Sequence, residues 1–404
     1  MPRDRRKVAF VITSLVGGGA QKQLAEVATR LGERGWKVVG IISLTPGGDW
    51  QTTLEARGLE VYSLGMRSPL SAPAALARAT RLMRGLAPDV VVGFLFHGTM
   101  LGAVAARMAG VPMVVASIRS ERMGGRWREW AFARAAGLWD VALVNSRSVG
   151  DSLVRRGILH VDGWDVIPNG IDPLSIGDRE LAGRDALGVD DSDFLWLAVG
   201  SLLPAKDYPT LLAALAELEG GRWQVLVAGE GPLAGALREM AVQLGLVDRI
   251  RFLGDRSDVP DLLRMADGFV NSSQWEGSPN AVLEAMLVGL PVVATRVGGT
   301  PDLFPTPEVG VLVPPNSPER LAQAMARIMK LSKGERVRMG QASRQAVLSN
   351  HTWDQVVTGW ERALTVSHTR GGRASVRTEA VAGPSPHPDE CPSSQQDHGD
   401  QNGD

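Results

Sequence analysis

The sequence predicts an α/β protein made of two doubly wound domains, each with a parallel sheet covered by helices. The chain has 404 residues, of which 44% are hydrophobic and 22% charged, which is too long for one core of ordinary size. Short β-branched runs alternate with Gly- or Pro-rich turns and amphipathic helices, the pattern of parallel βαβ units. This alternation stops once, near the middle of the chain, and then restarts, so two domains are expected.

The first half contains six expected strands. The helix expected between the first two, Ala20–Arg34, places Leu24, Val27, Ala28 and Leu31 at i, i+3, i+4 and i+7, which gives it one buried face. The expected strands are Val8–Thr13, Val38–Ser43, Val61–Leu64, Val90–Phe94, Met113–Ser117 and Val141–Asn145. We therefore assign residues 1–172 to an N-terminal Rossmann-like domain.

A turn-rich segment, Asp165–Pro173, marks the domain boundary, because two prolines bracket an Asn-Gly turn there. Residues 173–350 are then assigned to a second Rossmann-like domain. Its expected strands are Phe194–Val199, Trp223–Ala228, Ile250–Leu253, Gly268–Asn271, Pro291–Ala294 and Gly310–Val313. A second doubly wound sheet is the simplest account of this pattern.

The last expected helices run from about Pro318 to Lys330 and from Trp353 to Leu364. Residues 351–367 are assigned to a separate C-terminal helix. From 368 to 404, Gly, Ser, Pro, Gln and Asp dominate, so this tail has too little apolar surface to offset the entropy of ordering and is expected to be disordered.

Composition excludes several classes of protein. A formal net charge of -1, from 43 basic and 44 acidic residues, argues against a nucleic-acid binder. The single cysteine, Cys391, cannot form a disulfide within the chain, which suggests a reducing compartment and excludes metal sites built on cysteine. Because no apolar stretch reaches roughly 18 residues, we expect a cytoplasmic protein that meets a membrane, if at all, from its inner surface.

The strongest motif follows an expected strand and spans Ser272–Met286. Ser278 is expected to cap a helix whose first residue is Pro279, and the free N–H groups of that first turn would bind a phosphate anion. Glu276 precedes the helix and Glu284 lies less than two turns inside it, so both carboxylates can face one crevice and accept hydrogen bonds from sugar hydroxyls. The alternative is that both are solvated charges, although Glu284 sits in an apolar run where a buried unpaired charge would be costly.

Two further loops could bind phosphate. Gly17–Gln21 follows the first strand and opens the first helix, where glycines allow a close backbone approach; it is not a complete dinucleotide fingerprint, and a plain tight turn is the alternative. Lys206 follows the first strand of the second domain and could neutralise a diphosphate, although it could equally be an ordinary surface lysine.

Together these segments resemble the retaining nucleotide-sugar glycosyltransferases of glycosyltransferase family 4, which have the GT-B fold of two Rossmann-like domains facing a central cleft. The resemblance covers Arg6 to about Leu364, and two glutamates separated by seven residues are its most specific mark. It implies that the C-terminal domain holds the donor and the N-terminal domain the acceptor. The donor-binding residues that it implies are Gly18, Gly19, Ser201, Lys206, Phe252, Leu253, Glu276, Ser278, Pro279, Asn280, Ala281 and Glu284.

The resemblance also assigns roles within this set. Glu276 would contact the donor sugar, Glu284 the nucleotide ribose, Lys206 the diphosphate, Gly18 and Gly19 the distal phosphate, and the Phe252-Leu253 segment the base. Glu276, Lys206 and His97 are the catalytic candidates. The family implies retention at the anomeric carbon by a front-face route, in which the departing phosphate helps to take the acceptor's proton, with no cofactor and no obligatory metal.

This chain departs from the family at two positions. Ser201 stands where the family often has a phosphate-binding arginine, and Arg119 where it often has a histidine near the reacting carbon. Arg119 stays protonated and cannot act as a general base. His97 follows another strand end and is expected to line the cleft, and a histidine satisfied by local hydrogen bonds is the alternative.

The acceptor would be a glycan or a lipid-linked glycan. An arginine-rich segment interleaved with aromatics suits an acceptor or an anionic membrane surface, and an ordinary solvated helix with its aromatics in the core is the alternative. Its residues are Arg119, Arg122, Arg126, Trp127, Arg128 and Trp130. Two other functions stay open at this point, a Rossmann-type NAD-dependent oxidoreductase or epimerase and a non-catalytic sugar-nucleotide binding protein.

Overall fold

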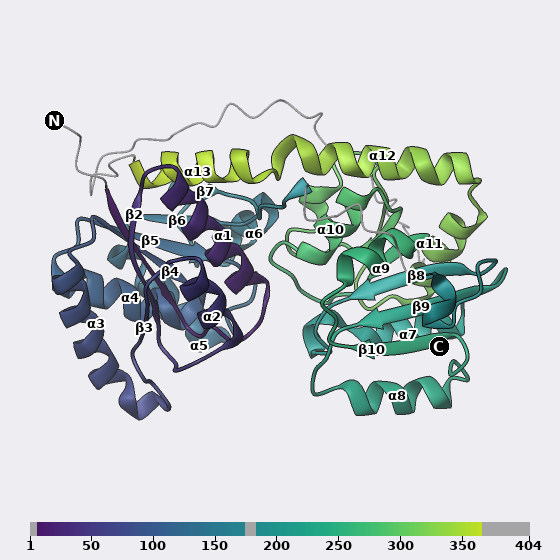
Figure 1. The fold of residues 1–404 in the computed structure, drawn as a ribbon, viewed down its shortest axis with the longest axis horizontal. Coiled ribbons are helices and arrows are strands. Elements are labelled where there is room, and N and C mark those ends of the chain that lie inside the picture. The colour runs from purple at the N-terminus through teal and green to yellow at the C-terminus, as the bar shows by residue number, and fades with distance from the viewer. Residues whose placement is uncertain (1–5, 174–182, 366–404) are drawn as a thin grey trace, which may run out of the picture. The chain divides into compact units, whose positions relative to one another are not determined.

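The computed structural model describes residues 6–173 and 183–365, all of which lie within one compact unit, Met1–Arg373. It confirms the predicted fold class, with two parallel sheets flanked by helices (Figure 1). The predicted tail, residues 368–404, lies outside the described residues. The two sheets are separated by residues 167–193, and the predicted boundary at 172 falls in that stretch.

The N-terminal sheet has the strand order β3-β2-β1-β4-β5-β6-β7, and every pair is parallel. Its chain order reverses between β1 and β4, and ligands of doubly wound sheets bind beyond the strand ends at such a point. The strands are β1 (Lys7–Ile12), β2 (Lys37–Ser43), β3 (Val61–Ser63), β4 (Val90–Phe94), β5 (Met113–Ile118), β6 (Val141–Val144) and β7 (Trp164–Val166). The helices are α1 (Gly19–Glu33), α2 (Asp49–Ala56), α3 (Ala72–Leu86), α4 (Leu95–Ala109), α5 (Arg126–Arg134) and α6 (Arg147–Arg155).

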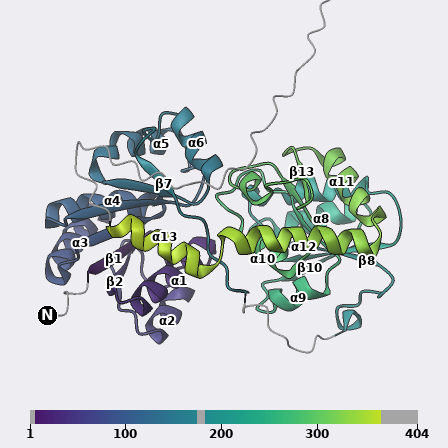
Figure 2. The same cartoon turned by 90° about the horizontal axis from the view of Figure 1, so that it is seen from above.

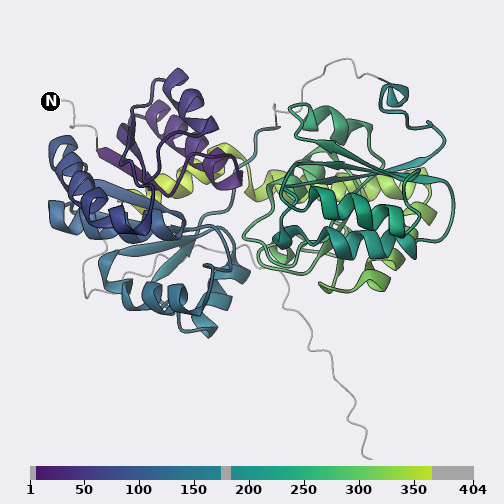
Figure 3. The same ribbon diagram turned by 90° about the horizontal axis from the view of Figure 1, so that it is seen from below.

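The C-terminal sheet repeats this plan with the order β10-β9-β8-β11-β12-β13, and its switch point lies between β8 and β11. Helices cover it on both faces (Figure 3). Its strands are β8 (Phe194–Val199), β9 (Trp223–Ala228), β10 (Ile250–Gly254), β11 (Gly268–Asn271), β12 (Val292–Thr295) and β13 (Val311–Val313). Its helices include the 3-10 turn η5 (Pro204–Lys206), α7 (Tyr208–Ala216), α8 (Ala234–Gln243), α9 (Val259–Met265), α10 (Asn280–Val288) and α11 (Pro318–Lys330).

Apolar strand residues explain both sheets. Strands such as β4 and β12 are buried along their whole length, as expected for parallel strands with helices on both faces. Each sheet has one apolar cluster on each face, so four clusters form the core of the described chain.

Two helices follow the second sheet. Helix α12 (Lys333–Asn350) packs on α10, where Gly340 and Gly289 approach so closely that a Cβ on Gly340 would lie 1.8 Å from the Gly289 oxygen. Helix α13 (Trp353–Thr365) belongs to the core of the first domain, where Trp360 stacks on Phe94 with 6.0 Å between ring centroids. Seen from above, α12 lies over the second domain and α13 over the first (Figure 2).

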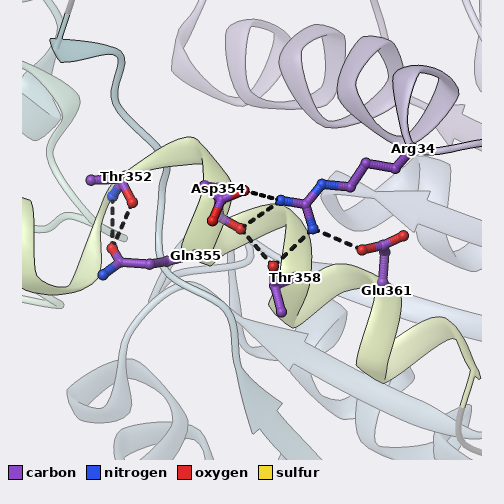
Figure 4. Close-up of polar contacts among 6 residues, drawn as sticks. All are labelled: Arg34, Thr352, Asp354, Gln355, Thr358 and Glu361. Carbon is purple, nitrogen blue, oxygen red and sulfur yellow. Dashed lines mark hydrogen bonds and ion pairs between the residues drawn. The ribbon is translucent and has the colours of Figure 1, made fainter.

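Polar contacts also hold α13 on α1. The Arg34 guanidinium, at the C-terminus of α1, donates to Thr358 Oγ1 at 2.8 Å and pairs with the carboxylates of Asp354 and Glu361 (Figure 4). At the start of α13, Thr352 donates from its backbone N–H and its hydroxyl to Gln355 Oε1. These contacts fix the helix that joins the end of the described chain to its first domain.

The apolar sequence patterns gave no indication of helix α12 or of strand β7. Helix α12 is polar on almost every face and buries only Gly340, Ser343 and Val347, so it lacks an apolar stripe. Its capping box, Ser332 with Glu335, was the available sequence signal. The short edge strand β7 has only half-buried residues. Among the helices of residues 6–173 and 183–365, none is long and apolar enough to cross a bilayer.

Candidate functional site

The turn between β11 and α10 forms the centre of the candidate site. The predicted helix start was wrong by one residue: Pro279 has extended backbone and precedes the helix, which begins at Asn280. Ser278 therefore does not cap it, and its buried Oγ has no hydrogen-bond partner among the described residues. The first helical bond runs from Leu283 N to Pro279 O at 3.2 Å, so the N–H groups of the first turn have no acceptor within the helix.

Glu276 lies at this turn and is held by the loop after β8. Its Oε1 lies 2.5 Å from Lys206 Nζ and accepts a hydrogen bond from Ser273 Oγ at 2.7 Å. The two charged side chains are only 24% and 11% exposed, for Lys206 and Glu276 respectively. Nearby, Tyr208 donates to Gly200 O at 3.0 Å, and burial together with the charge of Glu276 raises the pKa of Tyr208. The structure thus brings two of the predicted catalytic residues into direct contact.

Glu284 pairs with a lysine of the other domain. Lys22 Nζ, on α1, lies 2.6 Å from Glu284 Oε1. Both residues line a cavity of about 120 Å³, together with Asn280 on α10 and Gly170 on the connection between the domains. Glycines 18 and 19 start α1 one turn before Lys22, and Gly19 O accepts from Asn280 Nδ2 at 3.4 Å. The glycine loop and α10 are therefore in contact.

Asn169 connects the two domains through its side chain. Its Nδ2 donates to Ser278 O at 3.0 Å and to Asn280 Oδ1 at 2.8 Å. The next residue, Gly170, exchanges two 2.9 Å hydrogen bonds with the buried Gln23 amide of α1. Asn169 O lies 3.0 Å from His351 Nδ1, and burial lowers the pKa of that imidazole. The Asn-Gly segment, predicted only as a boundary turn, is thus a structural junction.

Arg119 is half-buried, and it lines a cavity of about 100 Å³ at the start of α4. Its guanidinium lies over the rings of Phe94 and Trp360, at 5.2 and 5.5 Å from their centroids. Nε donates to Ser117 Oγ and Nη1 donates to Asn169 Oδ1, both at 3.0 Å. Burial lowers the pKa of Arg119 to about 10, so it stays positively charged at neutral pH.

The backbones of the two domains also touch at the site. A Cβ added to Gly277 would lie 2.0 Å from Arg119 O, so only glycine permits this approach. Asp302, after β12, binds the N-terminus of α6: its Oδ2 accepts from the N–H of Arg147 at 2.6 Å and of Ser148 at 3.1 Å. A carboxylate at a helix N-terminus is favourable, so this contact stabilises the observed arrangement.

The remaining predicted donor residues lie around the ends of β8 and β10. Ser201 is exposed directly after β8. Phe252 and Leu253 are half-buried on the edge strand β10, with the Arg238 guanidinium 5.8 Å from the Phe252 centroid. Ala281 is half-buried in the first turn of α10.

His97 lies in the first turn of α4, where its ring meets Phe96 edge-on. Burial, and then the positive charge of Arg128, lower the pKa of His97, which favours the neutral imidazole. A cavity of about 100 Å³ opens beside it, lined by Phe96, Thr99 and Arg119 among others. Leu95, also in its wall, has a φ of 62°, a strained conformation for a bulky side chain.

Helix α5 carries the arginine-aromatic surface predicted from the sequence. Trp127 and Trp130 are each 64% exposed, and only Phe132 on this helix is buried. The predicted alternative, with the aromatics in the core, therefore holds for Phe132 and is wrong for the two tryptophans. Arg126 is exposed, Arg128 packs between Phe96 and Trp127, and Arg122 lies over the Trp275 ring at 4.3 Å from its centroid.

Two site residues escaped the sequence analysis, Lys22 and Asn169. Lys22 directly follows the Gly17–Gln21 loop, and its position one turn into α1 was the available signal. Asn169 lies in the Asp165–Pro173 turn, which the sequence indicated only as a domain boundary. Both act across the domain junction, which local patterns do not encode.

Family models match both domains of this chain. The family model described as Glycosyltransferase Family 4 matches residues 17–173, and that described as Glycosyl transferases group 1 matches residues 182–346. The Escherichia coli UDP-Gal:alpha-D-GlcNAc-diphosphoundecaprenol alpha-1,3-galactosyltransferase is 30% identical over 253 residues, which are 57% of this chain and 63% of that protein. The match thus spans less than two thirds of that relative's length.

A second relative and a solved structure match over more of their length. The Mycobacterium tuberculosis GDP-mannose-dependent alpha-(1-6)-phosphatidylinositol monomannoside mannosyltransferase is 27% identical over 369 residues, 83% of this chain and 92% of that one. The crystal structure of Anabaena Alr3699/HepE in complex with UDP and glucose has a TM-score of 0.78 at 21% identity, and the match covers 89% of this chain and 99% of that one. This likeness confirms the GT-B fold.

Proposed function

This chain belongs to glycosyltransferase family 4, and on that basis we propose that it transfers a sugar from a UDP- or GDP-sugar to a glycan or a lipid-linked acceptor. The sugar would be a hexose or an N-acetylhexosamine, and the product would enter polysaccharide, lipopolysaccharide or glycolipid synthesis. Named relatives that use UDP-galactose and GDP-mannose support this class of donor.

One observation carries the proposal: the first turn of α10 lies between two carboxylates, each of which is paired with a lysine. Glu276 contacts Lys206 and Glu284 contacts Lys22, and the lysines come from different domains. Between them the free N–H groups and the positive end of the helix dipole favour an anion. The carboxylates can accept hydrogen bonds from sugar hydroxyls, and the lysines and amides can bind phosphate oxygens. Together these groups match the chemistry of a sugar diphosphate.

The chemistry follows from charge that develops on the leaving group. As the bond from the anomeric carbon to the diphosphate breaks, negative charge grows on the phosphate oxygens. Lys206 and the amides of α10 would stabilise that charge in place of a metal ion. Glu276, released from Lys206 by the arriving phosphate, would accept hydrogen bonds from the sugar hydroxyls and orient the ring. We propose retention at the anomeric carbon, with the departing phosphate taking the acceptor's proton.

The acceptor would enter from the N-terminal domain, beside His97 and the cavity at the start of α4. A neutral His97 could accept a hydrogen bond from an acceptor hydroxyl. The exposed Trp127 and Trp130, flanked by arginines, would rest on an anionic membrane surface, which suits an acceptor carried by a lipid.

A donor screen tests the proposal. The purified chain is incubated with UDP- and GDP-sugars without acceptor, and release of the nucleoside diphosphate is measured. We expect slow hydrolysis of one donor, and loss of both this activity and donor affinity in Glu284→Ala and Lys206→Ala. Binding without hydrolysis would indicate a non-catalytic sugar-nucleotide binding protein, and wild-type affinity in both variants would contradict the site.

A further inference from the structure

Arg119 is a half-buried cation without a neutralising partner among the residues that the structure describes. Among the residues that the structure describes, no aspartate or glutamate oxygen lies within 4.0 Å of its guanidinium nitrogens. Its neighbours are the hydroxyl of Ser117, the amide oxygen of Asn169 and two aromatic faces. Neutral dipoles and π faces offset only part of the free-energy cost of burying a charge, so negative charge placed near Arg119 would still be stabilised.

The hydrogen bonds of Arg119 lead to the donor turn. A guanidinium can only donate hydrogen bonds, so the Asn169 atom that faces Arg119 must be the amide oxygen, Oδ1. Asn169 Nδ2 must then donate, and it does so to Ser278 O and to Asn280 Oδ1. Asn280 in turn directs its Nδ2 to Gly19 O. Arg119 thus orients the Asn169 amide, which in turn orients the Asn280 amide. This series of hydrogen bonds ends at the glycine loop.

The backbone of Arg119 reaches the same turn. Its carbonyl oxygen is the atom that a Cβ on Gly277 would strike, and Asn145 Nδ2 donates to that oxygen at 3.4 Å. Both ends of the residue are therefore fixed against the segment 277–280, where the proposed donor phosphates would bind.

We propose that Arg119 is a positioning residue of the donor site, whose missing counter-charge is supplied by the diphosphate of the bound nucleotide. This inference rests on the proposed function. Arg119 acts through Asn169, which it orients, and its charge adds to the positive field at the start of α10. In the free protein the uncompensated charge of Arg119 is destabilising, and the bound diphosphate removes that destabilisation.

The test compares Arg119→Met, which removes the charge but keeps much of the length, with Arg119→Lys, which keeps the charge but loses the planar fork. Calorimetric titrations measure the Kd of UDP and UMP, or of GDP and GMP if the wild-type protein prefers guanine. We expect Arg119→Met to weaken binding of the diphosphate about 10- to 100-fold, as for a lost hydrogen bond to a charged group, and that of the monophosphate at most about threefold. Arg119→Lys should lie between Arg119→Met and the wild type.

A second readout separates this role from a purely structural one. Because Arg119→Met removes an unneutralised half-buried charge, the Tm of the nucleotide-free variant should equal or exceed that of the wild type. Arg81→Met, on the exposed face of α3, makes the same charge change and should alter neither Kd nor Tm.

Three results would overturn the inference: a lower Tm or an unfolded Arg119→Met protein, equal losses of diphosphate and monophosphate affinity, or Arg119→Lys behaving like Arg119→Met. If the wild-type protein binds neither UDP nor GDP, the proposed function fails as well. If it binds one of them and Arg119→Met binds that nucleotide equally well, only the role of Arg119 fails.

Discussion

Substitution of Gly277 by alanine tests whether the observed contact between the domains is the productive one. The added Cβ would lie 2.0 Å from Arg119 O and 2.7 Å from Asn145 Nδ2. Non-bonded contacts below 3.0 Å to a Cβ essentially do not occur, so the two segments must separate by about 1 Å. A displacement of that size at reacting groups can cost about 100-fold in rate, and we expect a loss of this order in kcat.

The assay combines turnover with binding. Donor hydrolysis and transfer to acceptor report kcat, and titration with UDP or GDP reports binding by the C-terminal domain. Because Gly277 lies outside the core of either sheet, the Tm of Gly277→Ala should stay within about 3 °C of the wild type, as for a change of roughly 1 kcal/mol in a domain of this size. The loss should therefore appear in kcat more than in nucleotide affinity.

Gly235→Ala is the matched control, since nothing lies within 4 Å of the Cβ that it adds in α8. It should keep full activity. Wild-type turnover in Gly277→Ala would refute the reasoning, because the domains would then work without the close approach seen here.

Three further predictions concern other parts of the molecule. Glu276→Gln leaves the half-buried Lys206 without its carboxylate partner and should lower the free energy of unfolding by about 1–3 kcal/mol. Adding Lys206→Met to this variant should restore part of that loss, which a double-mutant cycle of denaturation experiments measures. Replacing both Trp127 and Trp130 by serine should weaken binding to vesicles containing anionic lipid at least about tenfold, with donor hydrolysis unchanged; unaltered vesicle binding would argue against the membrane surface. Burial lowers the pKa of His351, so as the pH falls the unfolded chain binds a proton at this histidine before the folded chain does. The free energy of unfolding should therefore fall as the pH drops below about 6.5, and it should fall less in His351→Gln. An equal decrease between pH 7.5 and 5.5 in wild type and variant, measured by urea unfolding, would contradict this.

The sequence predicts the fold well where local patterns carry it. Buried strands such as β4 and β12 are continuous apolar runs, and α1 has one apolar face. Helix α12 lacks such a face and is held by close contact of Gly340 with Gly289, a tertiary feature that no periodicity reveals. The start of α10 was placed too early because Ser278 engages Asn169 through its carbonyl oxygen and leaves its hydroxyl unbonded.

Some residues of the candidate site could likewise be predicted from local patterns, and others could not. Glu276 and Lys206 could be predicted because each follows a strand end at a recognisable spacing. The pairing of Lys22 with Glu284 joins residues 262 positions apart, so only the folded chain brings them together. Arg119 was grouped with the arginine-aromatic segment that follows it, and its contacts with Phe94 and Trp360 come from distant elements that no local pattern reveals.

The most direct measurement is a crystal structure of the protein with the nucleoside diphosphate that the donor screen selects. The account predicts phosphate oxygens within hydrogen-bonding distance of the Asn280 and Ala281 amides and of Lys206 Nζ, with the ribose hydroxyls on Glu284. A nucleotide bound elsewhere, with the pairs of Glu276 and Glu284 to their lysines undisturbed, would contradict it.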